Sequence, residues 1–195
     1  MSALLESHGF TNATLGWKAW LDTVQLDKTT AEQMAVLESS HPKAKVSDYY
    51  LLLVHQAEIL DQRSTAFNAI MYAPGGLSRA ERELASTVVS RVNGCVYCAS
   101  VHARHAAVYG KREADVDRLL EKGVSADLGD ERWNAIVAAS VALTSIPIDF
   151  GPEEIDRLRK AGLDELAIVD VINAASFFNW ANRLMLSLGE PALQK

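Results

Sequence analysis

Cysteine is scarce in this sequence, and blocks of basic residues and long apolar runs are absent from it. Two cysteines occur in 195 residues, too few for a disulfide-scaffolded secreted protein. The net charge of −6, with no cluster of lysine and arginine, argues against a surface for nucleic acid or for an anionic membrane. The first residues lack the basic start and apolar run of a signal peptide. The most apolar stretch, 166–178, is too short to span a bilayer. We therefore expect a cytoplasmic protein with neither a nucleic-acid nor a membrane partner.

The motifs of several common enzyme classes are also missing. The sequence contains no G-x-S-x-G nucleophile elbow, no P-loop, no dinucleotide-binding fingerprint and no H-E-x-x-H zinc motif. Hydrophobic residues make up 49% of the chain and charged residues 23%, which is ordinary for a globular protein. The length suits one domain with a full-sized core, or one domain and an extension.

Helical periodicity dominates the sequence, and no run alternates clearly enough to predict a strand. We interpret residues 1–46 as an N-terminal helical extension and residues 47–195 as the main domain. Within the extension, residues 30–33 (TAEQ) resemble a capping box that opens a helix. A short amphipathic helix before it is predicted from the spacing of four apolar residues: Trp17, Trp20, Leu21 and Val24.

The main domain is predicted to be all-α. One helix, or two in close succession, is predicted over 48–72, and the proline and glycines at 74–76 then force a turn. A capping box at 78–81 (SRAE) opens a helix that ends at Asn93-Gly94, because both residues tolerate the left-handed conformation. Further helices are predicted over 95–109, 113–122, 130–145, 152–161 and 164–188. Together they predict a compact all-α helical bundle.

The two cysteines, Cys95 and Cys98, form a C-x-x-C motif, and His102 follows four positions later. Residues three apart share one face of a helix, with Cα atoms roughly 5 to 6 Å apart, within the range that a disulfide needs. At a helix start, unpaired N–H groups and the helix dipole stabilise thiolate and lower its pKa. The His102 imidazole can reach the Cys98 sulfur directly or through one water and act as its base. The motif therefore predicts dithiol redox chemistry.

Glu83 is the candidate partner of His102. If the Asn-Gly turn reverses the chain into a helical hairpin, facing positions sum to about 186, and position 83 lies opposite position 102. Glu83 can then orient the imidazole ring and hold its proton. Small polar residues one turn apart give the same side a polar character that could serve a proton path: Ser86, Thr87 and Ser90.

Two other interpretations of the motif stay open. Two neighbouring cysteines can simply be small buried apolar residues. Cys95, Cys98, His102 and His105 also have the spacing C-x₂-C-x₃-H-x₂-H, which resembles a zinc site. On one helix these four residues span roughly 15 Å, too far for a single tetrahedral ion. We therefore expect no metal site, and His105 at or near the surface rather than acting as a second base.

These residues resemble the alkylhydroperoxidase AhpD-like group of the carboxymuconolactone decarboxylase superfamily. The match consists of Glu83, eleven intervening residues, the pair Cys95-x-x-Cys98, three further residues, and His102. Three flanking segments are similar to the peroxidase-related branch of the group: 76–84, 90–95 and 180–184.

The resemblance implies an AhpD-like helical fold that assembles into trimers or hexamers. It also implies a peroxidase that reduces hydroperoxides at the expense of a dithiol or protein reductant, with no bound cofactor. Cys98 would attack the O–O bond and become a sulfenic acid, and Cys95 would resolve it to a disulfide. His102, backed by Glu83, would move the protons. The prototype of the group has a histidine just before the second cysteine, where this chain has Tyr97, which either replaces that hydrogen bond or packs.

Two rival functions share part of this pattern. A disulfide oxidoreductase or redox-sensing module acting on a protein partner would keep the dithiol without peroxidase turnover. A non-redox enzyme of the carboxymuconolactone decarboxylase type would act on a lactone acid and gives no reason for the C-x-x-C. Peroxide-dependent turnover with a dithiol donor separates the peroxidase from both.

Overall fold

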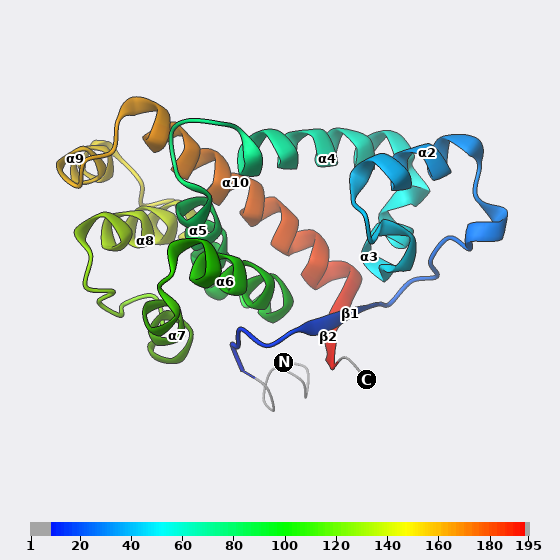
Figure 1. Cartoon of the computed structure of the whole chain (residues 1–195), viewed down its shortest axis with the longest axis horizontal. Coiled ribbons are helices and arrows are strands. Elements are labelled where there is room, and N and C mark those ends of the chain that lie inside the picture. The colour runs from blue at the N-terminus through cyan, green and yellow to red at the C-terminus, as the bar shows by residue number, and fades with distance from the viewer. Residues whose placement is uncertain (1–8, 194–195) are drawn as a thin grey trace.

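The computed structural model describes residues 9–193, which form a mainly helical protein with one two-stranded sheet (Figure 1). In chain order the elements are β1 (Leu15–Ala19), the 3-10 turn η1 (Leu26–Lys28), α2 (Ala31–Ser40), η2 (Ala44–Val46), α3 (Asp48–Leu53), η3 (Val54–Gln56), α4 (Ala57–Tyr72), α5 (Arg79–Val92), α6 (Val96–Gly110), α7 (Glu113–Lys122), α8 (Glu131–Thr144), α9 (Pro152–Lys160), α10 (Glu165–Leu188) and β2 (Gly189–Leu193). The predicted helices of the main domain are confirmed, and the stretch over 48–72 is two helices separated by η3. None of the described helices is long and apolar enough to cross a membrane.

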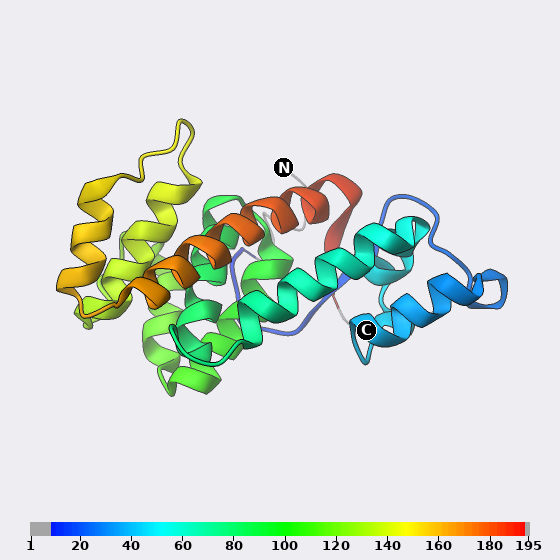
Figure 2. The same ribbon diagram turned by 90° about the horizontal axis from the view of Figure 1, so that it is seen from above.

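The long helices α4 and α10 lie side by side (Figure 2). Helices α8 and α9 lie toward one end of this pair, and α2 and α3 lie at the other end (Figures 1 and 2). Both predicted capping boxes are present: Thr30 caps α2 with Gln33, and Ser78 caps α5 with Glu81. These caps bond the free N–H groups at the helix starts, and the second one sets where α5 begins.

The segment around Trp17 departs from the prediction of a short helix. Residues 15–19 instead form β1, antiparallel to β2, with Trp17 opposite Pro191. Leu15 and Trp17 are buried, whereas Trp20 and Leu21 are 57% and 61% exposed, so the apolar face of the predicted helix does not form. A Cβ at Gly189 would lie 2.3 Å from the Lys18 carbonyl oxygen, so the two strands approach closely because a glycine stands there. The sheet was missed because its two strands come from opposite ends of the chain.

Helix α5 is the centre of the fold and packs against α4, α6, α8 and α10. Every residue from Ala80 to Ser90 is buried. The polar side chains on this helix are satisfied locally, because three hydroxyls donate to carbonyls one turn back along it: Ser86, Thr87 and Ser90. A helix enclosed on all sides can therefore carry buried polar groups at fixed positions.

The turn that leads into α5 is held by Asp170 of α10. Arg82 donates to Asp170 at 2.6 Å and to the carbonyl oxygens of Ala73 and Gly75 at 2.8 Å each. Gly76 has a φ of +61°, and a Cβ there would lie 2.1 Å from Asp170 Oδ2, so only glycine fits. The clamp determines the position and rotation of the first turn of α5.

Candidate active site

The Asn-Gly turn positions the two cysteines, as predicted. Gly94 has a φ of +76°, and the N–H groups of Gly94 and Cys95 donate to carbonyls in the last turn of α5 at 3.3 and 2.8 Å. These two bonds form a Schellman motif, which ends a helix where glycine takes the left-handed conformation. Helix α6 then starts at Val96, with Cys95 as its N-cap and Cys98 in its first turn.

The two thiols are in contact with each other. Their Sγ atoms are 2.9 Å apart, both are free, and both residues are buried. Cys98 lines a cleft of about 790 Å³, whereas Cys95 lines a separate pocket of about 20 Å³ beneath Trp17. A molecule entering the large cleft therefore meets Cys98 first.

The contact between the sulfurs separates the acidities of the two thiols. A hydrogen bond with Cys98 lowers the pKa of Cys95 in spite of its burial. The same contact, followed by burial, raises the pKa of Cys98 well above its ordinary value, while the Asn182 side chain and the charge of Arg63 act to lower it. The pair therefore releases one proton readily and holds the second. The pKa of Cys95 is lowered as predicted, but mainly by the Cys98 thiol and only to a lesser extent by a backbone N–H at the helix start. The pKa of Cys98 is raised, contrary to the prediction, because of the neighbouring sulfur and burial.

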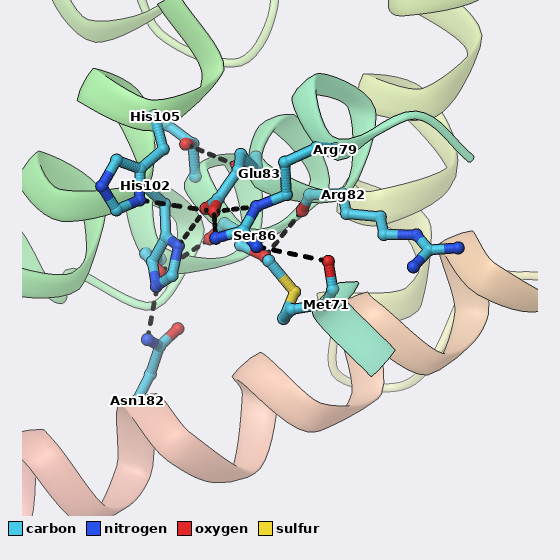
Figure 3. A network of polar contacts seen from close by, with 10 residues as sticks. Met71, Arg79, Arg82, Glu83, Ser86, His102, His105 and Asn182 are labelled. Carbon is cyan, nitrogen blue, oxygen red and sulfur yellow. Dashed lines mark hydrogen bonds and ion pairs between the residues drawn. The ribbon is translucent and has the colours of Figure 1, made fainter. Parts of the chain in front are cut away.

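Glu83 on α5 and His102 on α6 face each other (Figure 3), as the hairpin argument predicts. His102 Nδ1 lies 2.5 Å from Glu83 Oε2. The other carboxylate oxygen accepts a bond from Arg79 Nε at 2.7 Å, and His105 Nδ1 lies 3.4 Å from it. Burial alone would raise the pKa of Glu83, but the charge and hydrogen bond of His102, with help from His105 and Arg79, lower it well below its ordinary value. Glu83 is therefore a buried carboxylate anion.

The imidazole of His102 is held on two sides. Its Nδ1 is engaged by Glu83, and its ring packs edge-on against Phe178 with centroids 4.3 Å apart. His102 lines the same cleft as Cys98, but within residues 9–193 no direct hydrogen bond joins the imidazole to that sulfur. His105 is 43% exposed at its side chain. No group of three or more histidine, cysteine, aspartate or glutamate side chains in the described part of the chain is arranged to hold a metal ion.

The other candidate residues have separate positions. Thr87 donates to a carbonyl of its own helix at 2.8 Å, so its hydroxyl does not extend the contact between carboxylate and imidazole. Ser90 Oγ accepts a bond from Asn182 Nδ2 at 3.1 Å and thereby holds the amide that acts on Cys98. Tyr97 packs against the two cysteines at the edge of the cleft, and burial raises its pKa.

Other residues of the cleft were given no role in the site by the sequence analysis. Trp17 of β1 meets Tyr49 of α3 edge to face, with centroids 5.7 Å apart. Burial raises the pKa of Tyr49 to about 12. The guanidinium carbon of Arg63 on α4 lies 5.6 Å from the Tyr49 ring centroid. Asn182 of α10, which acts on the Cys98 thiol, is buried and is not among the residues that line the cleft. One signal was available, since Arg63 interrupts the apolar stripe of its helix.

Comparison with known proteins shows which sequences and structures this chain resembles. Residues 57–142 match the carboxymuconolactone decarboxylase family. The uncharacterised protein YdfG of Bacillus subtilis (strain 168) is 28% identical over 119 residues, which cover 61% of this chain and 80% of YdfG. A peroxidase-related protein from Ralstonia eutropha JMP134 with the alkylhydroperoxidase AhpD core has a TM-score of 0.75 at 20% identity, covering 87% of this chain and 90% of its own. The debrominase Bmp8 has a TM-score of 0.70 at 16% identity, covering the same shares of the two chains.

Proposed function

We propose, from the match of residues 57–142 to the carboxymuconolactone decarboxylase family and from the AhpD-like fold, that the protein is a thiol-dependent peroxidase in antioxidant defence. It would reduce hydroperoxides through a dithiol–disulfide cycle of Cys95 and Cys98. The observation that carries the proposal is a contacting dithiol beside a buried carboxylate–imidazole pair, with one thiol and the imidazole on the same cleft.

In the first step Cys98 is the nucleophile, because its side chain lines the cleft and that of Cys95 does not. His102 takes the proton of the Cys98 thiol, which its raised pKa would otherwise retain, and the resulting thiolate attacks the terminal oxygen of the hydroperoxide. The S–O bond forms as the O–O bond breaks, so that the thiol is oxidised to sulfenic acid. The leaving alkoxide takes the proton from the imidazolium and departs as an alcohol.

In the second step Cys95 attacks the sulfenic sulfur of Cys98. The 2.9 Å between the two Sγ atoms needs little movement. The S–S bond forms as the S–O bond breaks, and the hydroxyl leaves as water with the proton of Cys95. An external dithiol then returns two electrons and two protons by thiol–disulfide exchange. The protein itself ends the cycle unchanged.

Glu83 acts on the reaction through His102. A carboxylate bound to Nδ1 fixes the tautomer and leaves Nε2 to exchange protons. It also stabilises the imidazolium that exists between the two proton transfers. The remaining gap between the imidazole and the Cys98 sulfur is bridged by a water in the cleft or closed by the approach of substrate.

The test is steady-state reduction of cumene hydroperoxide with excess dithiothreitol. We expect turnover in the wild type, none in Cys98→Ser, and a loss of about 10²- to 10⁴-fold in His102→Ala. His55→Ala is the matched control, because His55 is exposed, bonds only to a backbone carbonyl and does not line the cleft. Absence of turnover in the wild type would overturn the proposal.

The roles of the two cysteines are tested separately by trapping sulfenic acid with dimedone after one equivalent of peroxide. Cys95→Ser should accumulate the dimedone adduct at Cys98, because nothing resolves the sulfenic acid. Cys98→Ser should give no adduct. The reverse pattern would make Cys95, the thiol with the lowered pKa, the attacking residue.

The likeness to a debrominase suggests a second reaction for the same dithiol. A dithiol can reduce an aryl bromide to the arene, giving bromide, a proton and a disulfide, and the cleft is lined by aromatic rings. Bromide release from a brominated pyrrole, measured with the same variants, tests this reaction. If the dithiol is reversibly oxidised but the protein turns over neither a hydroperoxide nor a brominated pyrrole, a redox module acting on a protein partner would be favoured instead.

A further inference from the structure

Arg63 is a cation enclosed by aromatic rings. Its guanidinium carbon lies 4.9 to 5.7 Å from four ring centroids, those of Tyr49, Tyr50, Phe67 and Phe177. One side-chain hydrogen bond, from Nη1 to the Tyr50 hydroxyl, is long at 3.5 Å. The Nε atom of Arg63 is buried without a hydrogen-bond acceptor, and the Tyr49 hydroxyl is buried without any hydrogen-bond partner. Most of the five guanidinium donors therefore have no protein acceptor within the described residues.

A charge in this position is costly unless something pairs with it. Removing an ion from water is unfavourable, and the attraction of ring faces offsets only part of that cost. Across residues 9–193 no carboxylate forms an ion pair with Arg63. Arg63 is a half-buried cation in a cleft, and its Nε atom and the Tyr49 hydroxyl lack partners, so this position is suited to an anionic ligand.

Three other cations line the cleft, of which two arginines are engaged and Lys43 is exposed, with no ion pair among the described residues. Arg79 pairs with Glu83, and Arg104 donates to two backbone carbonyls at 3.3 and 2.9 Å. The acid among the lining residues, Asp48, accepts a bond from the Ala19 N–H at 3.3 Å. The cleft wall is therefore basic although the whole chain has a net charge of −6.

We propose that Arg63 binds the carboxylate of the substrate, so that the enzyme selects hydroperoxides that carry a carboxylate on an apolar or aromatic body. That the substrate is a hydroperoxide rests on the proposed peroxidase function, whereas the carboxylate-binding site does not depend on it. A planar guanidinium matches a carboxylate with two parallel bonds. The cleft has the volume and aromatic lining of a small-molecule site.

Arg63 and the reacting thiol of Cys98 line the same cleft. A ligand held by the guanidinium therefore lies in the cleft that Cys98 faces, where the charge of Arg63 opposes the rise in the pKa of that thiol. Tyr49, whose hydroxyl is buried without a partner, can donate to the same carboxylate. Tyr49 lies on α3 and Arg63 on α4, whereas Cys98 lies on α6.

The binding test needs no peroxide chemistry. Calorimetry compares 4-isopropylbenzoate with neutral 4-isopropylbenzamide on the full-length reduced protein. We expect the carboxylate to bind at least about tenfold more tightly, and Arg63→Gln to lose about tenfold of that affinity. Arg104→Gln removes a cleft charge that already has protein acceptors and should change the affinity less than about twofold. Equal binding of the two compounds would overturn the proposal.

The kinetic test compares the carboxylate-bearing analogue of cumene hydroperoxide with cumene hydroperoxide itself. We expect the ratio of the two kcat/KM values to be about 10 in the wild type and near 1 in Arg63→Gln, with an intermediate ratio in Arg63→Lys. An equal loss on both substrates would mean that Arg63 acts on the thiolate and not on the substrate. If the benzoate binds through Arg63 and no hydroperoxide is consumed, the carboxylate site stands and the peroxidase function fails.

Discussion

Replacing Glu83 by glutamine tests the charge at the centre of the site. The substitution keeps the size of the side chain but leaves Arg79 and His102 without their shared anion. Glu83 is fully buried, and the side chains of Arg79 and His102 are only 21% and 10% exposed. Removing one member of a buried ion pair costs about 3 to 5 kcal/mol. Because Arg79 is partly solvated and glutamine still accepts one hydrogen bond, we expect the free energy of unfolding to fall by about 3 kcal/mol at pH 7.

The pH dependence of this difference has a definite sign. The folded-state pKa of Glu83 is lowered, whereas the unfolded value is about 4.3. A lowered carboxylate pKa contributes stability that is fully present above the unfolded pKa and is lost as the pH falls through the folded pKa. The advantage of the wild type over the variant should therefore persist at pH 7 and shrink below about pH 4.

Urea unfolding followed by circular dichroism, at one fixed protomer concentration, measures the effect. In thermal unfolding the melting temperature should fall by roughly 6 to 12 °C for a chain of this size. Glu58→Gln, at an exposed position on α4, should change the free energy of unfolding by less than about 0.5 kcal/mol. A loss at Glu83 below about 1 kcal/mol at pH 7, or one that is unchanged at pH 3, would refute the reasoning.

Three further substitutions give separate readouts. Gly76→Ala combines a φ of +61° with a steric clash and should lower the free energy of unfolding by more than about 2 kcal/mol. The control is Gly129→Ala, where the space is open and the loss should be about 1 kcal/mol. Equal losses in the two variants would contradict the prediction. Asn182→Ala removes a donor that acts to lower the pKa of Cys98. In a Cys95→Ser background, alkylation of the Cys98 thiol by iodoacetamide at pH 7 should therefore slow. An unchanged rate would exclude this role for the amide. Ser78→Ala removes the N-cap of α5 and should cost about 1 kcal/mol in urea unfolding, whereas no loss would mean that the clamp on the preceding turn alone sets the helix start.

The contact between Glu83 and His102 was predictable because it depends only on local geometry. A capping box begins α5, an Asn-Gly turn ends it, and α6 must return along it. Once two helices form a tight antiparallel hairpin, the positions that face each other follow from counting residues. The spacing of the cysteines within one helical turn follows from the same regular geometry.

The opposite wall of the cleft was not predictable in this way. Trp17, Tyr49 and Arg63 come from three elements whose relative placement depends on tertiary packing. The strand that carries Trp17 exists only because it pairs with residues 189–193. A period of two over five residues is too short to predict a strand whose partner is more than 150 residues away.

The sequence by itself determined the helices, their caps and the alignment of the carboxylate, the imidazole and the dithiol, because hydrogen bonds over three to five residues set these features. Tertiary structure alone decided that Cys98 faces the large cleft and Cys95 does not. It also decided that Arg63 lies among rings without a carboxylate. Both depend on side-chain packing between helices distant in the chain, for which local periodicity carries no information.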